Sequence, residues 1–141
     1  MVGTRLHCML GAIAAPMLVC VPTVVLPTAA MAQQPNVPVL AGGEAEFDAC
    51  GSQGVVRGLD PKGDGFLAVR SGPGSGHAML DKIHNGDIVN LCDQRGSWLG
   101  VVYSHETEDC GVGTPWPRRQ VYSGPCRSGW VYRKFVADYA G

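Results

Sequence analysis

The stretch FLAVRSGPGSG, Phe66 to Gly76, ends a strand-like run in a dense cluster of turn residues. From Gly72 to Gly76 every position except Ser75 is glycine or proline, more than an ordinary turn requires. These residues permit a sharp bend without side-chain clashes and stiffen part of it. We expect Arg70 at the bend, where its guanidinium could bond freed carbonyl groups or a carboxylate. A phosphate-binding loop is excluded, because neither a Gly-Lys-Ser/Thr end nor a helix follows.

Short apolar runs closed by turn residues continue on both sides of this stretch, over residues 54–59, 65–70, 78–84, 87–92, 97–103 and 129–139. The Asn85-Gly86 pair between two of these runs predicts a hairpin, because both residues tolerate positive φ. No stretch has a helical period, and 20 glycines and 10 prolines disfavour long helices. The pattern predicts an all-β domain over residues 50–139, a small barrel or sandwich of five to six short strands.

The run SWLGVVY, residues 97–103, has large side chains on both faces of the strand that it predicts. Strand periodicity would place Leu99, Val101 and Tyr103 on one face. The opposite face would then carry Trp98, Gly100 and Val102. One face must meet the core, so the other face is either covered or offered to a partner.

Residues 1–32 have the order of a secretory signal peptide, with Arg5, an apolar run over 9–26 and the small-residue end Ala30-Met31-Ala32. A permanent membrane anchor is the rival reading, but three prolines interrupt the run. A lipid-anchored Cys20 is a further alternative, although branched Val19 precedes it where a small residue is expected. We expect cleavage after Ala32, a periplasmic or secreted protein, and no stable membrane span after cleavage.

Residues 33–49 begin the remaining chain with prolines, glycines and little apolar periodicity, which predicts a flexible N-terminal segment. The whole chain has 11 basic side chains, and loss of residues 1–32 removes one of them, Arg5. The remaining 10 basic and 12 acidic side chains give a formal charge of −2. This balance supplies neither the basic face that nucleic acid requires nor a polybasic patch for anionic lipid.

Four cysteines remain after residue 32, namely Cys50, Cys92, Cys110 and Cys126. An even number in a small exported domain predicts two disulfides. A zinc site is the alternative, but these spacings contain no C-x-x-C pair. Three pairings are possible, and we favour Cys110 with Cys126 because both flank one Gly/Pro-rich segment.

Four motifs in order resemble bacterial Src-homology-3-like (SH3b) domains. They are AVRSGP within the opening stretch, NGDIVNL (85–91), GSWLGVVY (96–103) and SGWVYRKFV (128–136). The resemblance covers residues 55–136 and implies an SH3-like barrel. It also implies attachment to cell-wall peptides or peptidoglycan, or contacts with other proteins.

The segment between Tyr103 and Arg127 departs from that pattern. Where the family usually has a short hairpin, this chain has SHETEDCGVGTPWPRRQVYSGPC, called the insertion below and numbered 104–127 with Arg127 included. The expected fold is therefore a barrel with a long disulfide-closed insertion. The insertion could cover a binding groove or form a new one.

Catalytic groups are poorly supported. The histidines His77, His84 and His105 lie in or beside turns, where polar residues are solvated. The serines lack a G-x-S-x-G elbow, and paired cysteines offer no free thiol. We therefore expect no enzyme activity, no cofactor and no metal, with a small histidine-dependent hydrolase as the remaining catalytic alternative.

Aromatic residues are the better candidates for binding, because their rings stack on sugars and peptides. The candidates are Trp98, Tyr103, Trp116, Arg118, Trp130 and Tyr132. Trp98 and Trp130 could instead fill the core, and Trp116 could seal the barrel. The sequence predicts a non-catalytic exported binding module for cell-wall peptide, peptidoglycan or an exported protein. A structural or inhibitory protein docking through residues 104–127 is the alternative.

Overall fold

The computed structural model describes residues 34–140, and the expected signal peptide lies outside these described residues. Residues 34–140 form eleven strands and one short 3-10 helix, η1 (Arg133–Phe135), so the all-β prediction is confirmed. Within this range no helix has both the length and the apolar character needed to span a bilayer.

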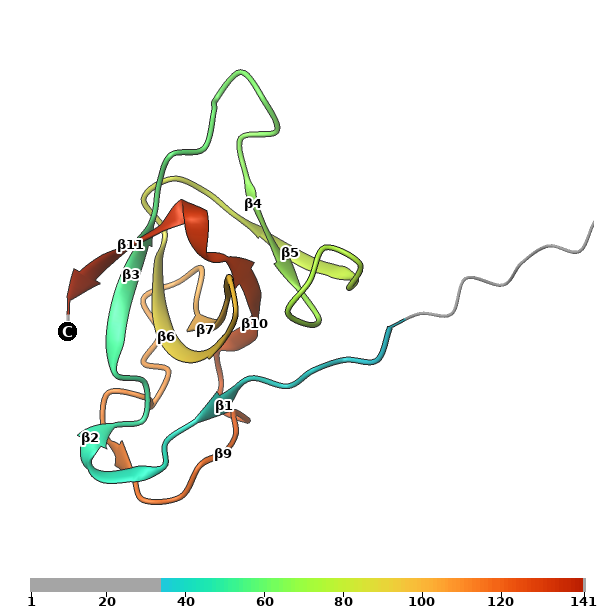
Figure 1. Cartoon of the computed structure of the whole chain (residues 1–141). Coiled ribbons are helices and arrows are strands. Elements are labelled where there is room, and N and C mark those ends of the chain that lie inside the picture. The colour runs from blue at the N-terminus through green and yellow to red at the C-terminus, as the bar shows by residue number, and fades with distance from the viewer. Residues whose placement is uncertain (1–33, 141) are drawn as a thin grey trace, which may run out of the picture. The chain divides into compact units, whose positions relative to one another are not determined.

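Seven antiparallel strands form the main sheet, in the order β11-β3-β6-β7-β10-β4-β5 (Figure 1). Their bounds are β3 (Ser52–Val56), β4 (Leu67–Arg70), β5 (Met79–Ile83), β6 (Ile88–Arg95), β7 (Trp98–Tyr103), β10 (Arg127–Tyr132) and β11 (Val136–Ala140). Among the described residues the end strands β11 and β5 do not pair, so hydrogen bonds do not close the expected barrel.

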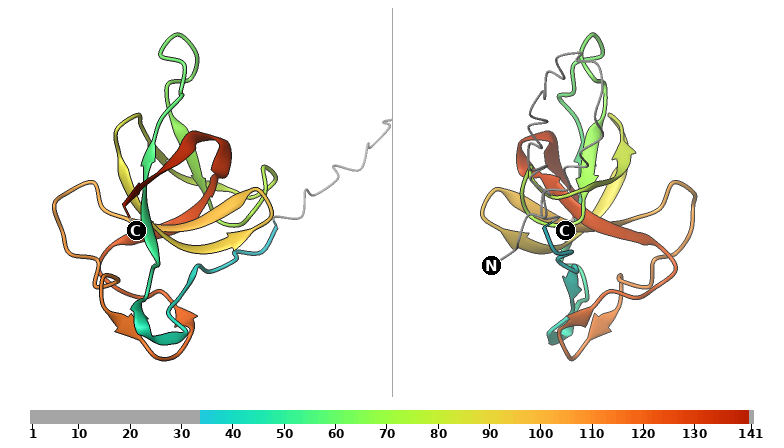
Figure 2. Two further views of the ribbon diagram at one scale, coloured as in Figure 1. Left: turned by 60° about the vertical axis from the view of Figure 1, so that its left-hand side comes forward. Right: turned by 90° about the vertical axis from the view of Figure 1, so that its right-hand side faces the viewer.

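Two small antiparallel pairs account for four of the eleven strands, and the main sheet has seven where five to six were expected. β1 (Leu40–Ala41) pairs with β9 (Gln120–Val121), and β2 (Glu44–Asp48) pairs with β8 (Pro115–Trp116). Each joins the N-terminal segment to the insertion. They lie at one end of the domain, with the loop between β3 and β4 at the opposite end (Figure 2).

Strand β7 is buried on both faces, which decides between the two possibilities left by its alternation. On one face Leu99, Val101 and Tyr103 join a core with residues of β3, β4, β5, β6 and β10. On the other face Val102 joins a second core that contains Trp130. The second face is therefore covered except at Trp98, which remains partly exposed.

The N-terminal segment supplies part of that cover and differs from the expected flexible lead-in. Val39 and Ala41 are 2% and 0% exposed. The Val37 amide donates to Ser71 (2.7 Å), and the Val37 carbonyl accepts the indole N–H of Trp130 (2.6 Å). Alternate apolar residues at 37, 39 and 41 mark this inward-facing side in the sequence, although neighbouring prolines obscure it.

The insertion supplies the rest of the cover. Both disulfides are confirmed, with Cys110 bonded to Cys126 and Cys50 bonded to Cys92. Tyr122 lies in the second core, where its hydroxyl donates to the Cys110 carbonyl (2.9 Å) and accepts from the Cys126 amide (3.1 Å). The disulfide and these two hydrogen bonds close the insertion on itself, and the buried Tyr122 ring packs it against the second core.

The Asn85-Gly86 turn forms, but the hairpin predicted around it is wrong. Gly86 has the expected positive φ of 96°, yet β5 pairs with β4 whereas β6 pairs with β3 and β7. The Asn85 side chain bonds both backbone groups of Leu59 (3.0 and 3.1 Å), and the Gly86 amide donates to Val56 (2.8 Å). These bonds attach the turn to the end of β3, so the chain leaves it to pair with β3.

The opening stretch bends after β4, as expected. Arg70 lies at the bend, and its Nη1 donates to the His77 carbonyl (2.9 Å). The glycines there are not among those with positive φ. Gly72 is needed for space instead, because a Cβ at this position would collide with the His77 ring.

Candidate functional site

A surface groove of about 670 Å³ lies beside β4, the start of β5, and the ends of β7 and β10. Four aromatic residues line it, together with Met79 and Arg70; the four are Phe66, Trp98, Tyr132 and Phe135. We call this feature the aromatic groove. None of its lining residues belongs to the insertion, so among the described residues the insertion covers the second core and leaves this groove open.

The strand period explains why these residues meet. Along β4, Leu67 and Val69 point into the core, which turns the intervening Ala68 and Arg70 toward the groove. Trp98 and Tyr132 are direct partners in the β7–β10 register and therefore sit side by side.

Three rings of the groove form a continuous series. The ring centroids of Trp98 and Tyr132 are 5.6 Å apart with planes at 53°, and those of Tyr132 and Phe135 are 6.3 Å apart with planes at 61°. Tyr132 is 39% exposed and Met79 is 49% exposed. Such a surface can bind apolar groups and flat faces by contact and stacking.

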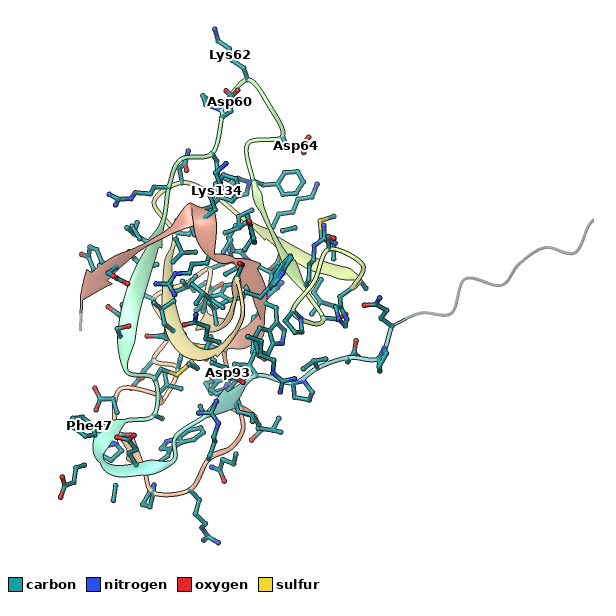
Figure 3. The ribbon with its side chains drawn as sticks, in the orientation of Figure 1. Phe47, Asp60, Lys62, Asp64, Asp93 and Lys134 are labelled. Atoms are coloured by element: carbon teal, nitrogen blue, oxygen red, sulfur yellow. A yellow bond between two sulfur atoms is a disulfide. The ribbon has the colours of Figure 1, made fainter. Side chains whose placement is uncertain are left out.

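Cations surround the rings. The Lys82 Nζ lies 4.2 Å from the centroid of Phe66, and the Lys134 Nζ lies 5.6 Å from that of Phe135. Figure 3 shows Lys134 on η1, the 3-10 helix that also carries Phe135. Asp64 is the acidic residue in the lining.

The six residues predicted to bind a ligand fall into three places in the structure: the aromatic groove, the core and the insertion. It brings Trp98 and Tyr132 together in the aromatic groove. Trp130 and Tyr103 are 0% and 3% exposed, so they belong to the core and offer no surface to a ligand. Their burial follows from their places on the inner strands β10 and β7.

Trp116 and Arg118 lie in the insertion, away from the aromatic groove. The Trp116 ring stacks on Tyr122 with centroids 6.3 Å apart and planes at 6°, and it packs partly buried against the second core. Arg118 is exposed. Trp116 therefore seals the second core, which was one of its two expected roles.

Sequence reasoning missed Phe66, Met79 and Phe135 as groove residues. Phe66 could have been found, because in the expected run 65–70 it alternates in step with Ala68 and Arg70. Phe135 lies in the final apolar run, which was expected as one continuous strand. The short helix η1 breaks that run and turns Phe135 toward Tyr132.

A polar cluster lies at the opposite side of β5, centred on Asp81. Its carboxylate oxygen Oδ2 accepts from the Tyr103 hydroxyl (2.8 Å), His105 Nε2 (2.7 Å) and Arg127 Nη1 (2.9 Å). Burial would raise the pKa of Asp81, but hydrogen bonds led by His105 outweigh it, so this pKa is lowered well below its ordinary value. Burial and the bond to Asp81 raise the pKa of Tyr103 above its usual range.

This cluster binds the insertion to the sheet, since His105 belongs to the insertion and Asp81 to β5. Within residues 34–140 no three side chains of histidine, cysteine, aspartate or glutamate converge as metal ligands would. His77 packs beside Gly72, and His105 is held by its hydrogen bond to Asp81 and by an edge contact with the Tyr103 ring.

A second hollow, of about 470 Å³, is lined by Asp93, Arg119, Arg133 and Asp138. Arg119 Nη2 donates to Asp93 (2.7 Å), whose side chain is only 6% exposed. Asp93 also accepts from the Leu40 amide (3.3 Å), so this pair joins the N-terminal segment and the insertion. Two of its four charged side chains, Arg119 and Asp93, are paired with each other, and no aromatic ring of the described residues lines it, which favours the aromatic groove as the candidate site.

No protein-family model, curated protein or solved structure matched this chain when it was compared with them.

Proposed function

We propose that this protein is a non-catalytic, exported binding module that recognises cell-wall peptide, peptidoglycan or an exported protein through the aromatic groove. The observation that carries the proposal is the series of neighbouring rings, Trp98, Tyr132 and Phe135, along an open groove. Exposed, closely packed aromatic rings are the groups that most often dominate binding energy.

The two disulfides support the export part of this proposal, because such bonds persist in oxidising compartments. The order of the SH3b-like motifs supports relation to that family. The motifs fall on β4, on the Asn85-Gly86 turn with β6, on β7, and on β10 with η1. In this proposal the open seven-stranded sheet corresponds to the barrel of those domains, and the insertion is an addition to it.

A pull-down of the full chain on purified cell wall tests the proposal. We expect retention of the unmodified protein and roughly a 30-fold loss of affinity for Trp98→Ala, since truncating a central aromatic residue costs about 2 kcal/mol. Thermal unfolding of each variant verifies that it is folded.

Trp116→Ala is the matched control, because Trp116 lies in the insertion. We expect it to retain binding whenever it is folded. Loss of binding in folded Trp116→Ala but not in Trp98→Ala would support docking through the insertion instead. Failure of the unmodified protein to be retained would remove cell wall as the ligand and leave an exported protein partner.

A further inference from the structure

We infer that the aromatic groove selects an extended, acidic peptide segment, whose apolar side chains contact the rings while its carboxylates meet cations around them. This inference rests on the proposed function and adds the chemical class of the ligand. Three cationic groups carry it: Arg70 in the lining, Lys82 over Phe66, and Lys134 over Phe135.

The positive charge at the groove is a local concentration on a chain that is otherwise slightly acidic. The chain has three lysines, and two of them lie over rings of this groove. In the lining itself Arg70 and Asp64 oppose one another, so the excess positive charge comes from the two lysines over the rings. Charges act over about 8–10 Å at physiological salt, so a ligand in the groove would experience all of them.

Arg70 is the cation best placed to bind a carboxylate directly. It is partly buried, and its bond to the His77 carbonyl holds the guanidinium at the groove wall. A guanidinium has five N–H donors, and this bond uses one of them. The planar group can therefore offer paired donors to a carboxylate.

The lining favours a peptide over a glycan. Its charged or hydroxyl side chains, apart from the Tyr132 hydroxyl, are Asp64, Arg70 and Ser75, too few to satisfy the many hydroxyls of a buried sugar chain. In addition, β5 is an end strand of the described sheet and begins at Met79, within the groove. The free backbone groups of an end strand can pair with an extended peptide.

Selection from a display library of random dodecapeptides, carried out on the full chain with its disulfides formed, tests the inference. We expect enriched peptides to carry more aspartate and glutamate than the unselected library, together with apolar residues. Their affinity should fall as salt is raised. Replacing both lysines, Lys82→Gln with Lys134→Gln, should weaken these peptides about 3- to 10-fold.

Lys62→Gln is the matched control for the lysine variants. Lys62 lies at the tip of the loop between β3 and β4 and points away from the sheet (Figure 3). The Lys62→Gln variant should bind the enriched peptides with unchanged affinity.

Three failures are distinguishable. Enriched peptides that need Trp98 but carry no excess of acidic residues would overturn this inference and leave the groove as a binding site. If no enriched peptide loses affinity in Trp98→Ala, both the inference and the proposed site are wrong. A loss of affinity in Lys62→Gln equal to that in the double variant would overturn the assignment of Lys82 and Lys134.

Discussion

Asp81 illustrates how one carboxylate joins parts of the chain that are distant in sequence. It accepts hydrogen bonds from Tyr103 on β7, His105 in the insertion and Arg127 on β10. The Arg127 and His105 side chains are 62% and 41% exposed, so solvent weakens their ion pairs. The hydrogen bond from buried Tyr103 is the least accessible to water, so we expect it to contribute most of the three to the stability of the fold.

Replacing this carboxylate should give a pH-dependent loss of stability. We expect Asp81→Asn to unfold about 1 to 2 kcal/mol more easily at pH 7, because charge-assisted hydrogen bonds are lost. The folded pKa of Asp81 is lowered from 3.8, so its contribution is fully present above about pH 4. As pH falls below that value the contribution disappears, and the two proteins should converge.

Thermal unfolding between pH 2 and pH 7 measures this difference. A gap between the two proteins that is the same at pH 2 and pH 7 would show that packing, not charge, accounts for the loss. Tyr103→Phe serves as the comparison, because it removes the buried donor and leaves the carboxylate in place.

At the scale of elements, the insertion stabilises the fold without lining the aromatic groove. Its disulfide closes a loop with a sequence separation of 16, whereas the Cys50–Cys92 bond has a separation of 42. Tyr122 and Val112 place its apolar side chains in the second core. Deleting residues 105–125 would therefore expose that core and unfold the protein. Removing only the disulfide of the insertion is the better test of what the insertion contributes to stability.

Replacing Cys110 and Cys126 together by serine should lower the free energy of unfolding by about 3 kcal/mol, as expected for a loop of this length. The loss for the Cys50 and Cys92 pair should be larger, about 4 kcal/mol. Urea unfolding measures both.

The folded Cys110/Cys126 variant should still bind whatever the unmodified protein binds through Trp98. Abolished binding in a variant that remains folded would contradict the separation between insertion and groove.

The element scale also shows why local patterns misled the pairing prediction. The Asn85-Gly86 dipeptide correctly predicts a turn, since its φ requirement is local. Which strand the chain joins after the turn depends on Leu59, 26 residues away, to which the Asn85 side chain bonds. A contact over that distance leaves no trace in the local pattern.

At the scale of the whole molecule, the N-terminal segment and the insertion together complete the second core beside β7 and β10. Val39 of the N-terminal segment and Tyr122 of the insertion lie in the same core as Trp130. β1 and β9 pair directly, and the Tyr122 amide donates to the Val39 carbonyl (3.0 Å). The N-terminal segment is therefore a structural part of the domain.

A charge placed in this segment should disrupt the second core. We expect Val39→Asp to destabilise the protein by about 3 kcal/mol or more, because a buried charge would lack a partner. The emission of Trp130 should shift to longer wavelength as water reaches it. Thermal unfolding and tryptophan fluorescence measure these effects.

Asn36→Asp introduces the same charge three residues earlier, at an exposed position. It should leave both measurements unchanged. A Val39→Asp variant as stable as this control would show that the segment does not seal the core.

The sequence by itself determined the strand-forming runs, the two disulfides and the role of Arg70 at its bend, because each depends on neighbouring residues or on cysteine count and position. Tertiary structure alone decided which aromatic rings are available. Trp98 and Trp130 both lie on strands with similar local patterns, yet residues 37–41 and the insertion bury Trp130 completely, whereas Trp98 packs against that core only partly buried and lines the groove. Burial depends on what packs over a residue from elsewhere in the chain, and strand periodicity carries no record of it.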